Sequence, residues 1–118
     1  MRSVIILAMM MASAIAAQTP AGAPTALKGD AANGKKLFTS DGCYQCHGYA
    51  AQGGGVAGPR LAPRPIAFAA FAKYLRSPSG DMPPYTAKVV TEQDLADLYA
   101  FLSAVPAPPA LDSIPLLK

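Results

Sequence analysis

The chain has 118 residues, fewer than the ~150 of a typical domain, and its formal net charge is only +3. This length excludes an enzyme with separate cofactor and substrate domains, and the mild charge argues against a nucleic-acid binder, which needs a concentrated basic face. Side chains suited to metal or redox chemistry are few: one His, two Cys and five Met, four of these Met within the first eleven residues.

Residues 1–17 have the pattern of a secretory signal peptide. Arg2 precedes an apolar run that starts at Val4 and ends in small residues, with an Ala-x-Ala site at Ala14 to Ala16. The run is shorter than the ~20 residues that a membrane-spanning helix requires. We expect cleavage and export to the periplasm, with no integral membrane segment left afterwards. A retained membrane anchor is the alternative.

The exported part divides into three segments by composition. Residues 18–27 are rich in Ala, Pro, Gly and Thr without periodicity, which predicts a flexible lead segment. Residues 106–118 form a Pro-rich C-terminal tail. The domain proper is therefore expected at residues 28–105.

The first of three predicted amphipathic helices covers residues 31–39, with Asp30 as its N-cap. Its apolar face consists of Gly34, Leu37 and Phe38, at the i, i+3, i+4 spacing of one helix side.

The second predicted helix has Pro65 in its first turn and ends before Pro78. The third follows Thr91, which with Asp94 three residues later resembles a capping box. The apolar stripes are Phe68, Phe71, Ala72 and Leu75 in the second helix, and Leu95, Leu98, Tyr99 and Leu102 in the third.

Two long connecting segments, residues 48–64 and 77–90, are rich in Gly and Pro and separate these helices. Loops of that length are uncommon in a small compact domain and need something to organise them. Bulky apolar side chains are also few for a core, which suggests that a large apolar cofactor completes it.

The chemistry of the chain is concentrated in a C-x-x-C-H motif, Cys43-Tyr44-Gln45-Cys46-His47. This motif is typical of c-type haem attachment. Two thiols three residues apart on a helical turn project to the same side, where both can add to the vinyl groups along one haem edge. The His that follows is then placed beneath the iron as the proximal ligand.

Three other uses of this motif were weighed. A thioredoxin-like pair belongs in a βαβ pattern, of which the sequence has no sign. A structural zinc site needs four ligands, and two Cys with one His fall one short. A disulfide between Cys43 and Cys46 would close a very short ring and leave His47 unexplained. Covalent haem is the favoured interpretation.

Met82 is the candidate for the second axial ligand. It lies 35 residues after His47, in the segment Gly80-Asp81-Met82-Pro83-Pro84-Tyr85. A thioether suits haem iron, and adjacent prolines reduce the entropy lost in presenting it. The alternative is that Met82 fills a gap in the core.

Taken together, these features resemble the class I monohaem c-type cytochromes, the small soluble bacterial cytochromes c, over residues 28–105. The matching residues are Gly34, Phe38, Cys43, Cys46, His47, Gly58-Pro59-Arg60-Leu61, Met82-Pro83-Pro84-Tyr85, Leu98 and Tyr99. The resemblance implies an all-α fold in which three to four helices wrap around one covalently bound haem c.

The resemblance also implies specific contacts. The first and last helices should cross where Gly34 permits close approach to Leu98 and Tyr99. The carbonyl of Pro59 should accept a hydrogen bond from the second ring nitrogen of His47. Since the chain has no Trp for a haem propionate, the substitutes considered are Arg60, Arg64 and Tyr74.

With both axial positions filled by protein, a haem does not readily bind substrate. The expected function is a periplasmic one-electron carrier that cycles between Fe(II) and Fe(III), passing electrons from a dehydrogenase to an oxidase or another acceptor, without enzymatic activity. Basic residues at the haem edge would steer docking. Residues 60–88 contain five basic residues and one acidic residue, Asp81. The five candidates for docking are Arg60, Arg64, Lys73, Arg76 and Lys88.

Two alternatives stay open. In one, the protein is a haem c subunit of a larger dehydrogenase, held through the tail that contains Leu111, Ile114, Leu116 and Leu117. In the other, Met82 dissociates and the protein is a haem enzyme or gas sensor.

Overall fold

The structure is a computed structural model that describes residues 27–53 and 57–117. The expected signal peptide and all but the last residue of the lead segment lie outside the described residues.

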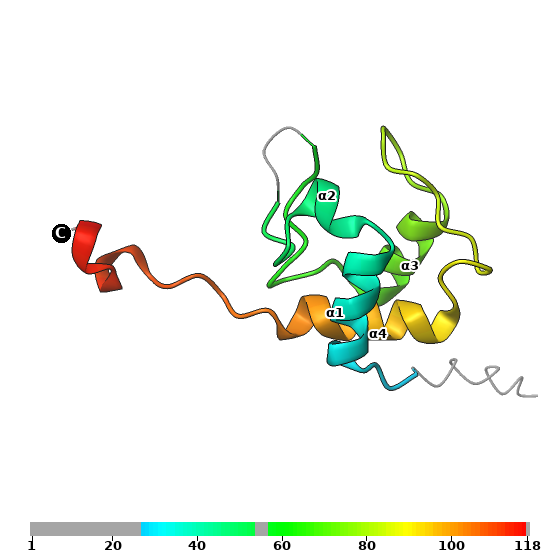
Figure 1. Ribbon diagram of the computed structural model, residues 1–118, viewed down its shortest axis with the longest axis horizontal. Helices are drawn as coiled ribbons and strands as arrows, with labels where there is room; N and C mark the ends of the chain where they lie inside the picture. The colour runs from blue at the N-terminus through cyan, green and yellow to red at the C-terminus, as the bar shows by residue number, and fades with distance from the viewer. Residues whose placement is uncertain (1–26, 54–56, 118) are drawn as a thin grey trace, which may run out of the picture.

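The described residues form helices and loops, without strands, as the sequence predicts. The helices are α1 (Ala31–Ser40), α2 (Cys43–His47), α3 (Phe68–Arg76) and α4 (Glu92–Ala104), followed by the short 3₁₀ turns η1 (Leu111–Ser113) and η2 (Pro115–Leu117). Figure 1 shows α1 crossing α4, with α2 and the segment after α3 on the upper side of α4. None of the helices described is long and apolar enough to cross a bilayer.

The α1–α4 crossing is the tightest contact of the fold. A side-chain carbon at the buried Gly34 would overlap the carbonyl of Asp97 and lie 2.9 Å from the backbone nitrogen of Leu98. Only glycine therefore fits this position of α1. The expected close approach of the two helices at Gly34 is confirmed.

A buried carboxylate joins the same two helices. Asp97 of α4 is 3% exposed and accepts hydrogen bonds of 2.8 Å each from the Asp30 backbone N–H, the Asn33 amide and the Gln93 amide. The bond from Asn33 and then that from Asp30 lower the pKa of Asp97 below its usual value, against the effect of burial. Asp97 therefore stays ionised and ties the start of α1 to the middle of α4.

The N-terminal ends of α1 and α4 are capped as the sequence predicts. The Asp30 carboxylate accepts from the backbone nitrogens of Ala32 and Asn33 at the start of α1. At the start of α4, Thr91 and Asp94 form the reciprocal capping box. Both local predictions are confirmed.

The predicted start of the second long helix is wrong. Pro65 lies before α3, which begins at Phe68 after the extended Ala67. Pro63 and Pro65 stand two residues apart and bias the residues before them to extended backbone. The helix therefore starts at the first residue of its apolar stripe, Phe68.

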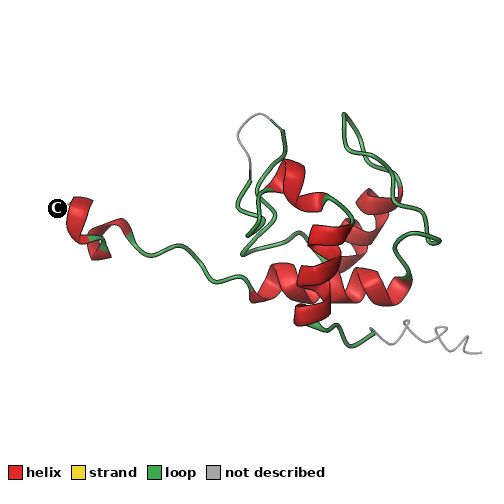
Figure 2. Ribbon diagram, in the orientation of Figure 1, coloured by secondary structure: helices red, strands yellow, loops and turns green. Residues whose placement is uncertain are grey.

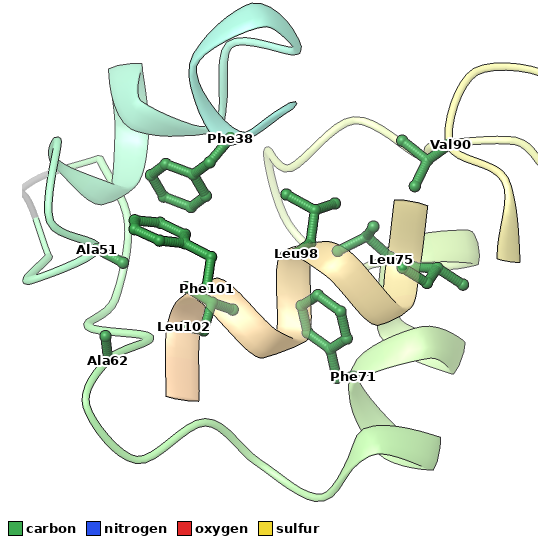
Figure 3. Packing of buried hydrophobic residues seen from close by; sticks show 10 residues of the cluster. Phe38, Ala51, Ala62, Phe71, Leu75, Val90, Leu98, Phe101 and Leu102 are labelled. Carbon is green, nitrogen blue, oxygen red and sulfur yellow. The ribbon is translucent and has the colours of Figure 1, made fainter. Parts of the chain in front are cut away.

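Buried apolar side chains from α1, α3 and α4 form one core, shown in Figure 3. Phe38 of α1 packs against Phe101 of α4 with ring centroids 5.3 Å apart. Ala51 and Ala62, from the segment after α2, close the core beside Phe101 and Leu102. The core thus extends from the α1–α4 crossing to the loop that follows the C-x-x-C-H motif.

Beyond α4 the chain runs away from the core as an extended tail (Figures 1 and 2). The structure adds two 3₁₀ turns there that the sequence analysis did not predict. Their apolar side chains are exposed: Leu111 is 75% and Leu116 is 94% exposed.

Candidate functional site

The C-x-x-C-H motif forms α2, a helix of five residues bounded by two glycines with positive φ. Gly42 has φ 78° and turns the chain from α1 into α2, and Gly48 has φ 77° and ends the helix. Other residues rarely adopt this conformation. The helical turn places Cys43 and Cys46 at i and i+3, which are neighbouring positions on one helix side.

His47 is held in one orientation by a partner twelve residues away. Its ring is 7% exposed, and Nδ1 lies 2.8 Å from the Pro59 carbonyl oxygen. Because a carbonyl only accepts, Nδ1 carries the proton and donates; in the neutral imidazole the lone pair then lies on Nε2. Among the described residues Nε2 has no hydrogen-bond partner. This is the form of a neutral imidazole that binds a metal.

The loop after α2 folds back on the motif to provide this partner. A side-chain carbon at Gly58 would lie 2.9 Å from Nδ1 of His47 and 2.8 Å from the Cys46 carbonyl. The absence of a side chain at Gly58 therefore lets Pro59 reach the imidazole. The Ala51 carbonyl accepts hydrogen bonds from the backbone nitrogens of Leu61 and Ala62, which hold the C-terminal part of the loop in place.

Both cysteines carry free thiols, and no disulfide joins them. Cys43 is half-buried and Cys46 is exposed. Burial, together with the nearby Asp41 carboxylate, raises the pKa of the Cys43 thiol. Within the part of the chain that the structure describes, no cluster of three His, Cys, Asp or Glu residues could hold a metal ion.

Met82 lies in the segment between α3 and α4, partly buried against the same core cluster as Cys43. Cys43 and Met82 therefore contact the same core. In Figure 1, α2 and the segment after α3 that contains Met82 both lie on the upper side of α4.

A family profile described as "Cytochrome C oxidase, cbb3-type, subunit III" matches residues 29–102. The chain belongs to this family of c-type cytochromes. No curated protein and no solved structure matches the chain. The matched residues lie within the predicted domain of residues 28–105 and contain the C-x-x-C-H motif, Pro59 and Met82. The cytochrome is thus a monohaem protein of the class suggested by its sequence, and haem-based electron transfer is the function of its domain type.

The residues of this cytochrome fit a haem c. Two free thiols one turn apart suit two thioether bonds, His47 has its Nε2 free, and Gly58 leaves the space that a side chain would fill beside the imidazole. Haem, when attached, supplies a one-electron centre. The chain's own contribution is to fix the imidazole of His47 through the Pro59 carbonyl.

Of the residues considered for a haem propionate, two have other partners. Arg60 donates to the Gln52 carbonyl at 3.3 Å, and the Tyr74 hydroxyl lies 3.0 Å from the Ser79 hydroxyl. Arg64 is exposed.

One of the five basic residues that are predicted to steer docking has partners within the chain. The Arg76 guanidinium donates to the Tyr85 carbonyl at 2.9 Å and forms an ion pair with Glu92 at 2.8 Å. Arg76 is therefore engaged inside the fold, whereas Arg60, Arg64, Lys73 and Lys88 have exposed side chains.

Tyr85 has no predicted role from the sequence beyond its place in the Met82 loop. In the structure its hydroxyl donates to the Asp41 carbonyl at 3.0 Å, across a separation of 44 residues. A tyrosine directly after Pro-Pro in a loop indicates a fixed position for its ring. The sequence gives no indication that its partner is the Asp41 carbonyl.

Proposed function

We propose that this cytochrome is a one-electron carrier of the periplasm that cycles its iron between Fe(II) and Fe(III). In this proposal Cys43 and Cys46 attach one haem c, and His47 and Met82 occupy the two axial positions of the iron. The observation that carries the proposal is the arrangement of His47, whose Nδ1 is bound to Pro59 and whose Nε2 is free, beside two free thiols on α2.

The proposed ligand set accounts for electron transfer without catalysis. Two protein ligands leave no open position on the iron for a substrate, so gain and loss of an electron remain. A Met/His pair also raises the reduction potential. The chain's role is to keep both ligands in place in either oxidation state, which the Pro59 contact to His47 supports on the proximal side.

The proposed partners are a dehydrogenase as electron donor and an oxidase or another acceptor. The family description names an oxidase subunit, which supports a place in a respiratory redox chain. Four exposed basic residues support docking on acidic surfaces, namely Arg60, Arg64, Lys73 and Lys88. Rates of electron transfer to the partner should then fall as salt concentration rises.

Spectroscopy of the exported holoprotein tests this function. We expect a low-spin oxidised spectrum with a sulfur-to-iron charge-transfer band, reversible one-electron voltammetry and no rapid binding of CO by the reduced protein. A high-spin spectrum with rapid CO binding would instead support a haem enzyme or gas sensor.

A stable subunit role is the second candidate, because the tail after α4 exposes apolar side chains. Leu111, Leu116 and Leu117 are each more than half exposed on η1 and η2, which is unusual for a segment that contacts only water. Co-purification of a dehydrogenase with the full chain, but not with a chain ending at Val105, would support this role. Equal recovery with both chains would exclude the tail as a docking element.

A further inference from the structure

The loop that carries Met82 is anchored on both sides of that residue. On the N-terminal side, the Tyr74 hydroxyl of α3 bonds the carbonyl and the hydroxyl of Ser79, three residues before Met82. On the C-terminal side the anchor is Tyr85, three residues after Met82. The two anchors differ in strength, because Tyr74 is an exposed residue whereas Tyr85 is partly buried against the core.

Tyr85 is bonded through all of its polar groups. Its backbone nitrogen donates to the Leu75 carbonyl at 2.9 Å, and its carbonyl accepts from Arg76 at 2.9 Å. Its hydroxyl donates to the Asp41 carbonyl at 3.0 Å. The first two bonds join the loop to the end of α3, and the third joins it to the residue that precedes Gly42 and α2.

The hydroxyl of Tyr85 remains a donor at every physiological pH. Burial is the largest cause that raises the pKa of Tyr85, to about 12. Cys43 and Tyr85 both pack against the same core cluster.

Arg76 extends this anchor to α4. One guanidinium nitrogen donates to the Tyr85 carbonyl, and the other pairs with Glu92 in the first turn of α4. The Arg76 side chain is 24% exposed, whereas that of Glu92 is 68% exposed. The bond to the loop carbonyl is therefore better shielded from water than the ion pair and should contribute more.

The two residues between Met82 and Tyr85 are Pro83 and Pro84. Proline fixes φ near −65°, so this part of the loop has little freedom to absorb a displacement. A shift of Tyr85 is then passed to Met82 instead of being lost in the intervening backbone.

We propose that Tyr85 is the positioning residue for Met82, and that its hydroxyl bond to Asp41, supported by Arg76, holds the thioether at the haem iron. The proposal rests on the proposed function, because it takes Met82 as an iron ligand. It assigns to Tyr85 and Arg76 a role in keeping Met82 on the iron, in addition to any role in folding.

The test is Tyr85→Phe in the holoprotein, measured by binding of imidazole to the oxidised form. Imidazole competes with Met82 for the iron, so a less firmly held thioether gives tighter imidazole binding. Loss of one hydrogen bond should tighten the apparent imidazole affinity about three- to tenfold. The sulfur-to-iron charge-transfer band should remain but disappear at correspondingly lower imidazole concentration.

Two further variants separate the parts of the anchor. Arg76→Gln removes both guanidinium bonds and should also tighten imidazole binding. Glu92→Gln removes only the exposed ion pair and should leave the affinity within about twofold of wild type. An equal effect of Glu92→Gln and Arg76→Gln would mean that the ion pair with α4, not the loop carbonyl, matters, and would overturn the assigned role of Arg76.

Controls distinguish positioning from general stability. Tyr49→Phe removes the hydroxyl of an exposed tyrosine outside the Met82 loop and should change nothing. Gly34→Ala destabilises the α1–α4 crossing and should lower the melting temperature without changing imidazole affinity. If Gly34→Ala tightens imidazole binding as much as Tyr85→Phe does, the effect of Tyr85 is structural and the proposal is wrong.

The outcomes also separate this proposal from the proposed function. A wild-type protein without the sulfur-to-iron band would overturn Met82 ligation itself. A wild-type protein with that band, together with wild-type imidazole affinity in Tyr85→Phe, would overturn the positioning role alone.

Discussion

The α1–α4 crossing and the site segments, residues 41–62 and 77–90, are stabilised in different ways. At the crossing, helices touch at Gly34, apolar side chains fill the space around Phe38 and Phe101, and Asp97 has three hydrogen-bond donors. The described residues of the site segments form one short helix and loops, held by hydrogen bonds such as those of His47 to Pro59 and of Tyr85 to Asp41. Side chains of the protein alone fill the space at the crossing. The site segments are rich in Gly and Pro and have few bulky apolar side chains, as expected where a cofactor fills the space.

The difference teaches which parts of the protein depend on haem. Glycine at position 34 and an ionised Asp97 are required by helix packing alone. The two glycines around α2 turn the chain at positive φ, and Gly58 leaves the room that the Pro59 contact to His47 needs, so these positions serve the geometry of the site. Mutations in the two regions should therefore produce separable effects, on stability at the crossing and on the haem in the site segments.

The largest effect is expected from His47→Ala, which removes the proposed proximal ligand. No stable holoprotein should accumulate, because the iron loses its fixed imidazole while the crossing is untouched. Visible absorption of the exported protein measures this. Gln45→Ala, at an exposed position of α2 between the cysteines, is the control and should give normal haem content. A well-folded, redox-active His47→Ala protein would overturn the site assignment.

Met82→Ala should retain the covalent haem but lower the reduction potential and admit external ligands, because the soft thioether that favours Fe(II) is lost. Voltammetry and CO binding measure the two effects. Val89→Ala, in the same segment and 60% exposed, should leave both unchanged. An unchanged potential in Met82→Ala would remove Met82 as a ligand.

Gly34→Leu should affect the other region. The new side chain overlaps the backbone at Asp97, so we expect a loss of about 3 kcal/mol or more in unfolding free energy. The spectrum of the remaining folded holoprotein should not change. Ala32→Leu, on an exposed position of the same helix, should cost little. Wild-type stability of Gly34→Leu, measured by denaturant unfolding, would show that the close crossing does not exist in solution.

Asp97→Asn should have the smallest effect, a loss of about 1–3 kcal/mol at neutral pH, because an amide cannot accept all three hydrogen bonds. Since the folded pKa of Asp97 is lowered, its ionised form stabilises the fold above the ordinary carboxyl pKa of 3.8, and that contribution is lost as the pH falls through the folded pKa. The difference in unfolding free energy between wild type and Asp97→Asn should therefore become smaller below about pH 4. Asp112→Asn in the exposed tail is the control. A gap that is constant with pH would contradict ionisation of Asp97.

Features that are local in the chain could be predicted from the sequence. The cap at Asp30, the capping box of Thr91 and Asp94 and the helical face around Phe38 depend on residues within one or two turns. The start of α3 was mispredicted because a proline signal at Pro65 was weighed above the apolar stripe that begins at Phe68.

Contacts between distant residues could not be predicted in the same way. Asp97 reads as an ordinary helix carboxylate, and its partner Asp30 lies 67 residues away. Arg76 is one of the basic residues predicted to steer docking, and its bonds to Tyr85 and Glu92 have no signal in the sequence because they depend on how the loop returns. The Pro59 contact to His47 was expected only from resemblance to the cytochromes c, and the structure contains it.

The intact mass of the purified protein, measured under denaturing conditions, tests the central claim most directly, namely that the site segments are built around covalent haem. The account predicts a chain that begins near residue 18 and carries the added mass of one haem, which Cys43→Ala with Cys46→Ala abolishes. A polypeptide mass without haem in the wild-type protein, with the haem released on denaturation or never bound, would contradict it.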